Sequence, residues 1–163
     1  MLMKRSIHPI LARGQRFIRP ARAAVVVLGA LFGAAVAVSH PAVDFGRWYP
    51  YDQALELALE HGRPALLYFR SDHCPYCEQM ETFVLSAPEV DHTLRRCAVV
   101  ASVTLGRPDT EEPARHWRVF GTPTFVFVLP EGEQWVEVSR AFGSMPRAEF
   151  LAFLNAVCKE EGR

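Results

Sequence analysis

Residues 65–85, ALLYFRSDHCPYCEQMETFVL, place two cysteines between a short apolar run and a segment with helical spacing. The first five residues are all apolar, which is typical of a strand buried on both faces. A helix is predicted over 74–85. Its residues Met80, Phe83 and Val84 recur at helical spacing, so we expect them to face inward. A C-x-x-C that leaves a buried strand and opens a helix is the arrangement of a redox pair.

Each position of this pair has a chemical reason. Cys74 would lie at the helix N-terminus, where free backbone N–H groups and the helix dipole stabilise a thiolate. A lowered pKa would make Cys74 the attacking sulfur. Pro75 suits the first helical position, where its missing N–H costs nothing. Cys77 lies almost one turn further in and would resolve a mixed disulfide formed by Cys74. Attack and resolution complete the cycle, so we expect no metal and no organic cofactor.

Two other interpretations of the pair fit the sequence less well. A purely structural disulfide does not favour C-x-x-C between a strand and a helix. A zinc or copper site would need a second pair of ligands at a regular spacing. His73 is adjacent, but Cys97, Cys158 and His92 show no such spacing. The redox pair is therefore the prediction, and a metal-carrying binding module is the alternative.

The rest of the body alternates between helical and strand-like segments. Asp52 can cap a helix that Gly62 can end, and its apolar stripe is Ala54, Leu55, Ala58 and Leu59. Strands are predicted over 98–105, 124–129 and 135–142, and helices over 111–119 and 147–159. The order α-β-α-β-α-β-β-α predicts one α/β domain with a central mixed sheet covered by helices on both faces.

Charge is distributed unevenly along the chain, although the formal net charge is zero. All 18 acidic residues lie at Asp44 or later, with 12 of the 18 basic ones, so the body carries a net charge of −6. Nucleic-acid binding needs a basic face that neutralises phosphates. We therefore expect no nucleic-acid partner.

Residues 1–38 have the layout of an export segment. Six basic residues and no acidic one precede an uncharged stretch over 23–38 that ends in small residues. This layout fits a cleaved signal peptide. The stretch is slightly shorter than the roughly 20 apolar residues that span a bilayer, but its long basic flank also fits a membrane anchor. A buried core helix is a third interpretation, which so short a chain could hardly cover. We expect a linker over 39–50 and a folded body over 51–163.

Residues 120–124, FGTPT, supply a second motif just before a predicted strand. Together with a C-x-x-C about 45 residues earlier, they resemble the thioredoxin superfamily. The resemblance implies the thioredoxin-like α/β fold and a cis-proline loop facing the cysteine pair. Thr122 and Pro123 would then form a ledge for the substrate, to which Pro75 and Tyr76 would also contribute. The alternative is an ordinary trans Thr–Pro bond that enters a strand.

The resemblance extends over roughly 48–157. It is carried by 77–81 (CEQME), 86–90 (SAPEV), 121–124 (GTPT) and the Phe-Gly at 142–143. The chain looks most like periplasmic thioredoxin-like proteins, among them the C-terminal domain of transmembrane thiol–disulfide interchange proteins and the thioredoxins of sulfur-oxidation systems. This implies a periplasmic monomer that reduces protein disulfides with electrons from a membrane donor. A dithiol oxidase of secreted proteins is the alternative. The sequence shows no helical insertion in the thioredoxin-like core, of the kind that the periplasmic oxidase has, which argues against it. Service in cytochrome maturation or sulfur metabolism is a further possibility.

The chain departs from the thioredoxin pattern around the cysteine pair. Tyr68 stands where thioredoxins usually keep a buried carboxylate that helps to take the proton from the resolving cysteine. Arg70 and His73 stand where thioredoxin has aromatic residues. Either cation, if close to Cys74, would stabilise its thiolate and raise the reduction potential of the pair.

Two further cysteines lie at predicted element ends. In a thioredoxin-like topology, Cys97 and Cys158 would both fall on the face of the sheet opposite the active site. There they could form a structural disulfide, provided that their Cα atoms lie within about 7 Å. The alternative is two small buried apolar residues that do not touch.

Overall fold

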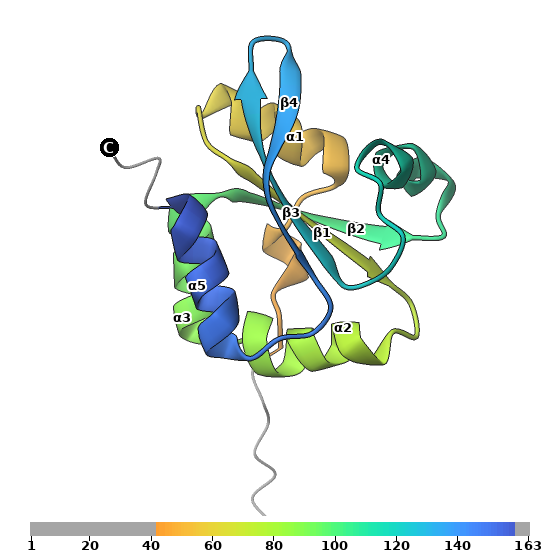
Figure 1. Cartoon of the computed structure of the whole chain (residues 1–163), viewed down its shortest axis with the longest axis vertical. Helices are drawn as coiled ribbons and strands as arrows, with labels where there is room; N and C mark the ends of the chain where they lie inside the picture. The colour runs from red at the N-terminus through yellow and green to blue at the C-terminus, as the bar shows by residue number, and fades with distance from the viewer. Residues whose placement is uncertain (1–41, 159–163) are drawn as a thin grey trace, which may run out of the picture. The chain divides into compact units, whose positions relative to one another are not determined.

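A mixed sheet lies at the centre of the computed structural model, which describes residues 42–158 (Figure 1). Its strands are β1 (Ala65–Ser71), β2 (Val99–Leu105), β3 (Thr124–Glu131) and β4 (Gln134–Phe142). Their order is β2-β1-β3-β4, with β1 parallel to β2 and the other pairs antiparallel. The predicted export segment over 1–38 lies outside the described residues.

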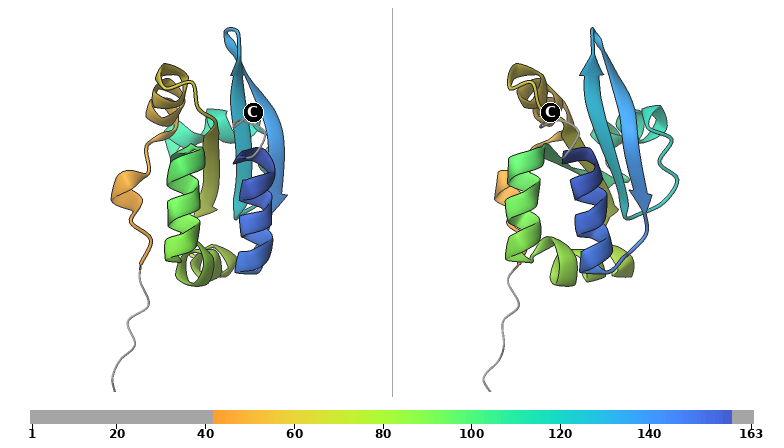
Figure 2. Two further views of the ribbon diagram at one scale, coloured as in Figure 1. Left: turned by 90° about the vertical axis from the view of Figure 1, so that its left-hand side faces the viewer. Right: turned by 60° about the vertical axis from the view of Figure 1, so that its left-hand side comes forward.

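Helices cover both faces of this sheet, as predicted. One face carries α1 (Tyr51–Glu60) and α4 (Glu111–His116), and the other carries α2 (Pro75–Met80), η2 (Glu81–Leu85), α3 (Pro88–Cys97) and α5 (Arg147–Cys158). Strand alternation divides the core accordingly. Leu66 and Tyr68 pack toward α2, α3 and α5, whereas Leu67 and Phe69 pack toward α1 and α4. Figure 2 shows α3 and α5 side by side over their face.

The first helix packs closely because its inner face is small. Ala54 and Ala58 are fully buried, whereas Leu59 of the predicted stripe is 57% exposed. The prediction that Asp52 caps this helix is wrong. The helix begins at Tyr51 after Pro50, so Asp52 lies within the first turn, where its charge still complements the helix dipole. Gly62 adopts φ +58° and ends the helix as predicted, because glycine accepts this left-handed conformation without strain.

The helix that carries the cysteines changes its winding after one and a half turns. Residues 81–85 form a π-helical turn, in which the Ser86 N–H donates to the Glu81 carbonyl at 3.2 Å. The wider turn shifts the phase of the side chains that follow. Leu85 is therefore buried, while Phe83, predicted to face inward, is 53% exposed.

One helix, α3, was not predicted. Its composition is mostly polar, which conceals a short apolar stripe formed by Val90, Leu94 and Cys97. These residues recur at i, i+4 and i+7, and Pro88 occupies the first turn, where proline is favoured. The spacing and the proline together could have identified the helix.

Part of the expected linker belongs to the folded body. Residues Phe45–Arg47 form the 3-10 turn η1, and the Trp48 ring meets Tyr68 edge-on at 5.7 Å between centroids. Tyr49 pairs with β2: its N–H donates to the Val100 carbonyl at 2.9 Å, and its carbonyl accepts from the Ser102 N–H at 3.1 Å. This segment thereby covers the outer edge of β2, which would otherwise offer unpaired backbone groups.

Candidate active site

Cys74 and Cys77 lie at the start of α2, just after the turn that follows β1. Cys74 is the N-cap of α2, and its sulfur accepts a hydrogen bond from the Cys77 N–H at 3.2 Å. The Cys74 carbonyl accepts from the N–H groups of Cys77 and Glu78, both at 3.0 Å. Pro75 occupies the first turn. These bonds give the Cys77 and Glu78 N–H groups partners at the helix start and aim a backbone N–H at the Cys74 sulfur.

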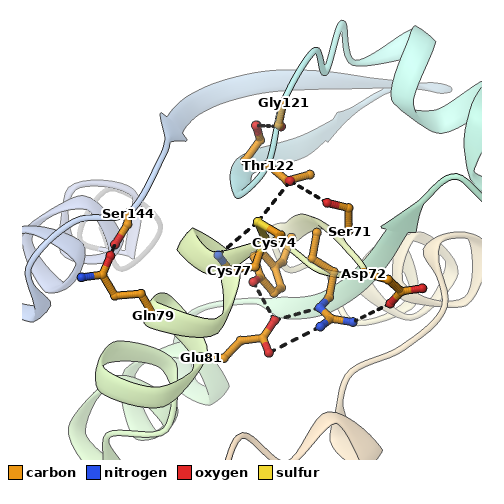
Figure 3. Close-up of a disulfide and its surroundings, with 12 residues drawn as sticks. Ser71, Asp72, Cys74, Cys77, Gln79, Glu81, Gly121, Thr122 and Ser144 are labelled. Atoms are coloured by element: carbon orange, nitrogen blue, oxygen red, sulfur yellow. Dashed lines mark hydrogen bonds and ion pairs between the residues drawn. A yellow bond between two sulfur atoms is a disulfide. The ribbon is translucent and has the colours of Figure 1, made fainter.

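The two sulfurs are joined in a disulfide, with the Cα atoms 5.2 Å apart (Figure 3). Cys74 is 8% exposed and Cys77 is fully buried. A reagent that approaches from solvent therefore meets Cys74 first. This asymmetry suits an attacking sulfur at Cys74 and a resolving sulfur at Cys77.

The Thr-Pro loop lies directly against this disulfide. The Thr122–Pro123 peptide bond is cis, and the Thr122 hydroxyl donates to the Cys74 sulfur at 3.3 Å. The Ser71 hydroxyl lies 2.9 Å from the Thr122 hydroxyl. Behind the loop, the Gly143 N–H donates to the Pro123 carbonyl at 2.9 Å. Thr122 and Pro123, which lie far from Cys74 in sequence, are thus brought to its side.

An open groove of about 830 Å³ begins at this loop. Its aromatic lining consists of Tyr76, Phe83 and Phe142, which are 63%, 53% and 69% exposed. Thr122 reaches the groove from the loop. The Phe142 ring lies so close to Gly121 that an added Cβ there would be 2.9 Å from its Cε2 atom. The rings of Tyr76, Phe83 and Phe142 form an aromatic wall of the groove. Because Gly121 has no side chain, this wall can lie close to the loop beside the cysteine pair.

A half-buried polar network lies beneath the cysteine pair (Figure 3). The Tyr68 hydroxyl donates to Glu81 Oε1 at 2.9 Å, and Arg70 Nε donates to the same oxygen at 2.8 Å. Burial first, and then the negative charge of Glu81, raise the pKa of Tyr68 well above its ordinary value. Burial alone would lower the pKa of Arg70, but the hydrogen bond and charge of Glu81 outweigh it, so the pKa is raised. The network therefore holds Tyr68 neutral and Arg70 charged.

Glu81 was not predicted as part of the site. Tyr68 replaces the buried carboxylate of the thioredoxin pattern, and Glu81 brings a carboxylate to its hydroxyl from the following helix. The spacing from Cys77 to Glu81 is i, i+4, which places both residues on one helical face. That spacing was the available signal. Arg70, which would stabilise the Cys74 thiolate if it lay close to it, is paired with Glu81 and, at 3.9 Å, with Asp72.

The second cysteine pair also forms a disulfide. Cys97 and Cys158, 61 positions apart in sequence, have Cα atoms 5.2 Å apart. Their expected place on the opposite face of the sheet is wrong, because α3 and α5 pack into the same core as α2. The short connection at 86–87 between η2 and α3 cannot cross the sheet. The bridge lies instead where α3 and α5 end.

Comparison with known proteins agrees with this architecture. A family model described as a thioredoxin-like domain matches residues 51–158. The chain belongs to the thioredoxin-like family. A solved thioredoxin from Thermus thermophilus superimposes with a TM-score of 0.66 at 57% identity, covering 71% of this chain and 89% of that one. The oxidised C-terminal domain of Neisseria meningitidis DsbD superimposes with a TM-score of 0.56, covering 68% of this chain and 98% of that one. At 19% identity, this second likeness shows the fold alone.

Curated relatives are thiol:disulfide interchange proteins. DsbD of Klebsiella pneumoniae is 34% identical over 105 residues, which are 64% of this chain and 17% of that protein. DsbD 1 of Pseudomonas aeruginosa is 30% identical over 98 residues, or 60% of this chain and 16% of that protein. The chain thus spans about a sixth of the length of these relatives. The predicted enzyme class, a thioredoxin-like thiol–disulfide oxidoreductase, is confirmed.

Within residues 42–158, no three His, Cys, Asp or Glu side chains gather into a group that could hold a metal ion. Among the helices of the same residues, none is long and apolar enough to cross a membrane.

Proposed function

We propose that this thioredoxin-like protein reduces disulfides of extracytoplasmic proteins through Cys74 and Cys77, using electrons from a membrane donor. The observation that carries the proposal is the disulfide at the start of α2, with Cys74 slightly exposed, Cys77 buried and Thr122 against the sulfur. Helix N-terminal cysteines with nearby donors ionise readily, and the thiolate is the reactive form.

The reaction begins from the dithiol. The Cys74 thiolate attacks one sulfur of a substrate disulfide, forming a mixed disulfide and expelling the other substrate sulfur as a thiolate. Cys77 then loses its proton and attacks the Cys74 sulfur, which expels the second substrate thiolate. Two electrons have passed to the substrate, and the Cys74–Cys77 disulfide remains. A donor dithiol reverses these two exchanges and restores the reduced enzyme.

The substrate is proposed to lie across the Thr-Pro loop and in the groove beside it. Tyr76 and Thr122 line this groove, and their chain neighbours Pro75 and Pro123 are proposed to complete the substrate-binding surface. Three exposed aromatic rings line the groove, so an extended segment with apolar side chains beside its cysteine fits it best. Exposed apolar surface of this kind is typical of protein-binding sites.

An extracytoplasmic location is supported by two independent features. The Cys97–Cys158 disulfide is stable in an oxidising compartment. Residues 1–38 have the composition of an export segment or anchor.

The direction of electron flow is tested by the reduction potential of the Cys74–Cys77 couple. The chain is equilibrated against defined thiol buffers, and the redox state of the peptide carrying both cysteines is read by alkylation and mass spectrometry. A value near −200 mV or lower, as in glutaredoxins and thioredoxin, is expected for a reductase. A value near −120 mV would identify an oxidant of secreted proteins instead.

Cys77→Ser separates a redox enzyme from a metal-carrying module. The variant keeps the attacking sulfur and lacks the resolving one, so Cys74 should accumulate as a mixed disulfide with protein substrates, while turnover is lost. Cys74→Ser is the matched control and should trap none. A Cys77→Ser protein that traps no substrate, while the wild type binds zinc or copper through both sulfurs, would overturn the redox proposal.

A further inference from the structure

Two hydroxyl groups form a line that ends on the attacking sulfur. Ser71 is the last residue of β1, and Thr122 lies in the loop before β3. Their hydroxyl oxygens are 2.9 Å apart, and Thr122 Oγ1 is 3.3 Å from Cys74 Sγ (Figure 3). Both residues are half-buried. Ser71 itself makes no described hydrogen bond to either cysteine, so any effect on the sulfur passes through Thr122.

The proton count gives this line a direction. A threonine hydroxyl has one proton to donate and two lone pairs that accept. When Thr122 donates to the Cys74 sulfur, its oxygen is left as an acceptor, and the Ser71 hydroxyl is the donor that reaches it. Without that donor, the Thr122 hydroxyl is free to rotate toward water. Hydrogen bonds in such a chain polarise one another and strengthen the last bond.

The hydrogen bond from Thr122 to Cys74 differs in strength between the two redox states of the pair. A disulfide sulfur is a weak acceptor, whereas a thiolate is charged and accepts much more strongly. Reduction by two electrons and one proton converts the disulfide into a Cys74 thiolate and a Cys77 thiol. The thiolate would then receive the Thr122 hydroxyl and the Cys77 N–H, which lies at 3.2 Å. Donors fixed in place before the charge forms stabilise the reduced state over the oxidised one.

We propose that Ser71 is a positioning residue that fixes the Thr122 hydroxyl as a donor to the Cys74 sulfur and so tunes the reactivity of the pair. The inference rests on the proposed redox function of this site. It assigns to Ser71, on the strand that precedes the motif, a share in setting the acidity of Cys74 and the redox equilibrium of the pair.

The test is a double-mutant cycle with Ser71→Ala and Thr122→Val in the full chain. The acidity of Cys74 is measured from the pH dependence of its alkylation rate, and the dithiol–disulfide equilibrium from the alkylated peptide. Ser71→Ala should raise the pKa of Cys74 and shift the equilibrium about 2- to 10-fold toward the disulfide. Thr122→Val should shift both in the same direction by a larger factor. Neither substitution alters the charged and titratable groups next to the pair in β1, α2 and the turn between them, which are Arg70, Asp72, His73, Glu78 and Glu81.

The decisive comparison is Ser71→Ala in the Thr122→Val background. There it should produce no further shift, because Ser71 acts through the Thr122 hydroxyl. Ser71→Thr keeps a hydroxyl at the end of β1 and should behave as the wild type. Ser86→Ala is the matched control, since the Ser86 hydroxyl donates to the Thr82 carbonyl at 2.7 Å.

Two results would overturn the inference. One is an unchanged Cys74 pKa and equilibrium in Ser71→Ala. The other is a Ser71→Ala shift of equal size with and without the Thr122 hydroxyl, which would show that Ser71 acts on the sulfur by another route. In both cases the wild type would still exchange disulfides. A wild type with no reversible dithiol couple would instead defeat the proposed function.

Discussion

Tyr68 and Glu81 together replace the buried carboxylate that the thioredoxin pattern has on the first core strand. The Tyr68 side chain is fully buried, and its hydroxyl has a carboxylate oxygen at 2.9 Å. Ionising this tyrosine would place a second negative charge beside Glu81 without solvent to screen it. The pKa of Tyr68 is raised in the folded protein for this reason. The free energy of unfolding therefore depends on pH in the alkaline range.

Tyr68→Phe should make stability less sensitive to alkaline pH. An unfolded tyrosine loses its proton near pH 10, whereas folded Tyr68 keeps it to a higher pH. The unfolded chain then binds fewer protons, so the free energy of unfolding falls as pH rises above about 10, by up to about 1.4 kcal/mol per pH unit per group. Urea unfolding between about pH 9 and 11 should show a shallower decline in Tyr68→Phe than in the wild type.

Tyr51 is a useful comparison for this experiment. Burial raises its pKa, although the hydrogen bond from Trp117 acts in the opposite direction. Tyr51→Phe should therefore also flatten the decline, and the double variant should flatten it further. Equal slopes in the wild type and Tyr68→Phe would contradict the assignment of the shift to this residue.

At the same scale, the reactive cysteines were predicted from the sequence, whereas their supporting residues were not. Cys74 and Cys77 were found because their chemistry depends on local spacing, in a strand-to-helix turn that the sequence itself predicts. Ser71 and Glu81 act through contacts with Thr122 and Tyr68, which lie far from them in sequence. Contacts of this kind depend on how β1 packs against its neighbours. The only local signal was the i, i+4 spacing from Cys77 to Glu81, and Ser71 had none.

Elements were predicted where apolar spacing dominates and were missed where it is weak. The strands β1, β2, β3 and β4 all lie within two residues of the predicted bounds. The apolar runs of β1, β2 and β3 fill the part of the sheet that is covered on both faces, whereas no residue of the edge strand β4 is buried. The helix α3 was missed because its polar residues outnumber the buried ones. Phe83 was misplaced because a π-helical turn alters the phase that α-helical spacing assumes.

Gly121, in the loop between α4 and β3, is expected to influence the shape of the groove. A Cβ added at Gly121 would lie 2.9 Å from the Phe142 ring, which is 69% exposed and has room to turn outward. Gly121→Ala should therefore cost little stability but move the aromatic wall. We expect a raised KM for a protein substrate, with the reduction potential of the Cys74–Cys77 couple unchanged.

Phe142→Ala supplies the matched variant for this groove. It removes the ring and leaves the Thr-Pro loop untouched, so it should also raise KM without altering the potential. A change in potential as large as the change in KM, in either variant, would show that the wall acts on the sulfurs and not on substrate binding.

At the scale of the whole molecule, the two disulfides have separate tasks. The Cys74–Cys77 bridge lies at the start of α2, beside the groove. The Cys97–Cys158 bridge joins the ends of α3 and α5, which pack over the same face of the sheet (Figure 2). The two helices are otherwise held by apolar contacts, among them those of Leu94 and Leu154 in one core. The second bridge therefore fixes α3 to α5, and both helices pack in the same core as α2.

Replacing Cys97 and Cys158 together by alanine should separate these tasks. Cross-linking residues 61 positions apart restricts the unfolded chain, and its loss is expected to lower the free energy of unfolding by about 2–4 kcal/mol. Urea unfolding of the oxidised proteins measures this difference. The potential of the Cys74–Cys77 couple should stay that of the wild type, because neither replaced residue makes a described hydrogen bond to the active-site cysteines. If the potential moved while the stability did not, the second bridge would be part of the redox machinery, and its structural role would be wrong.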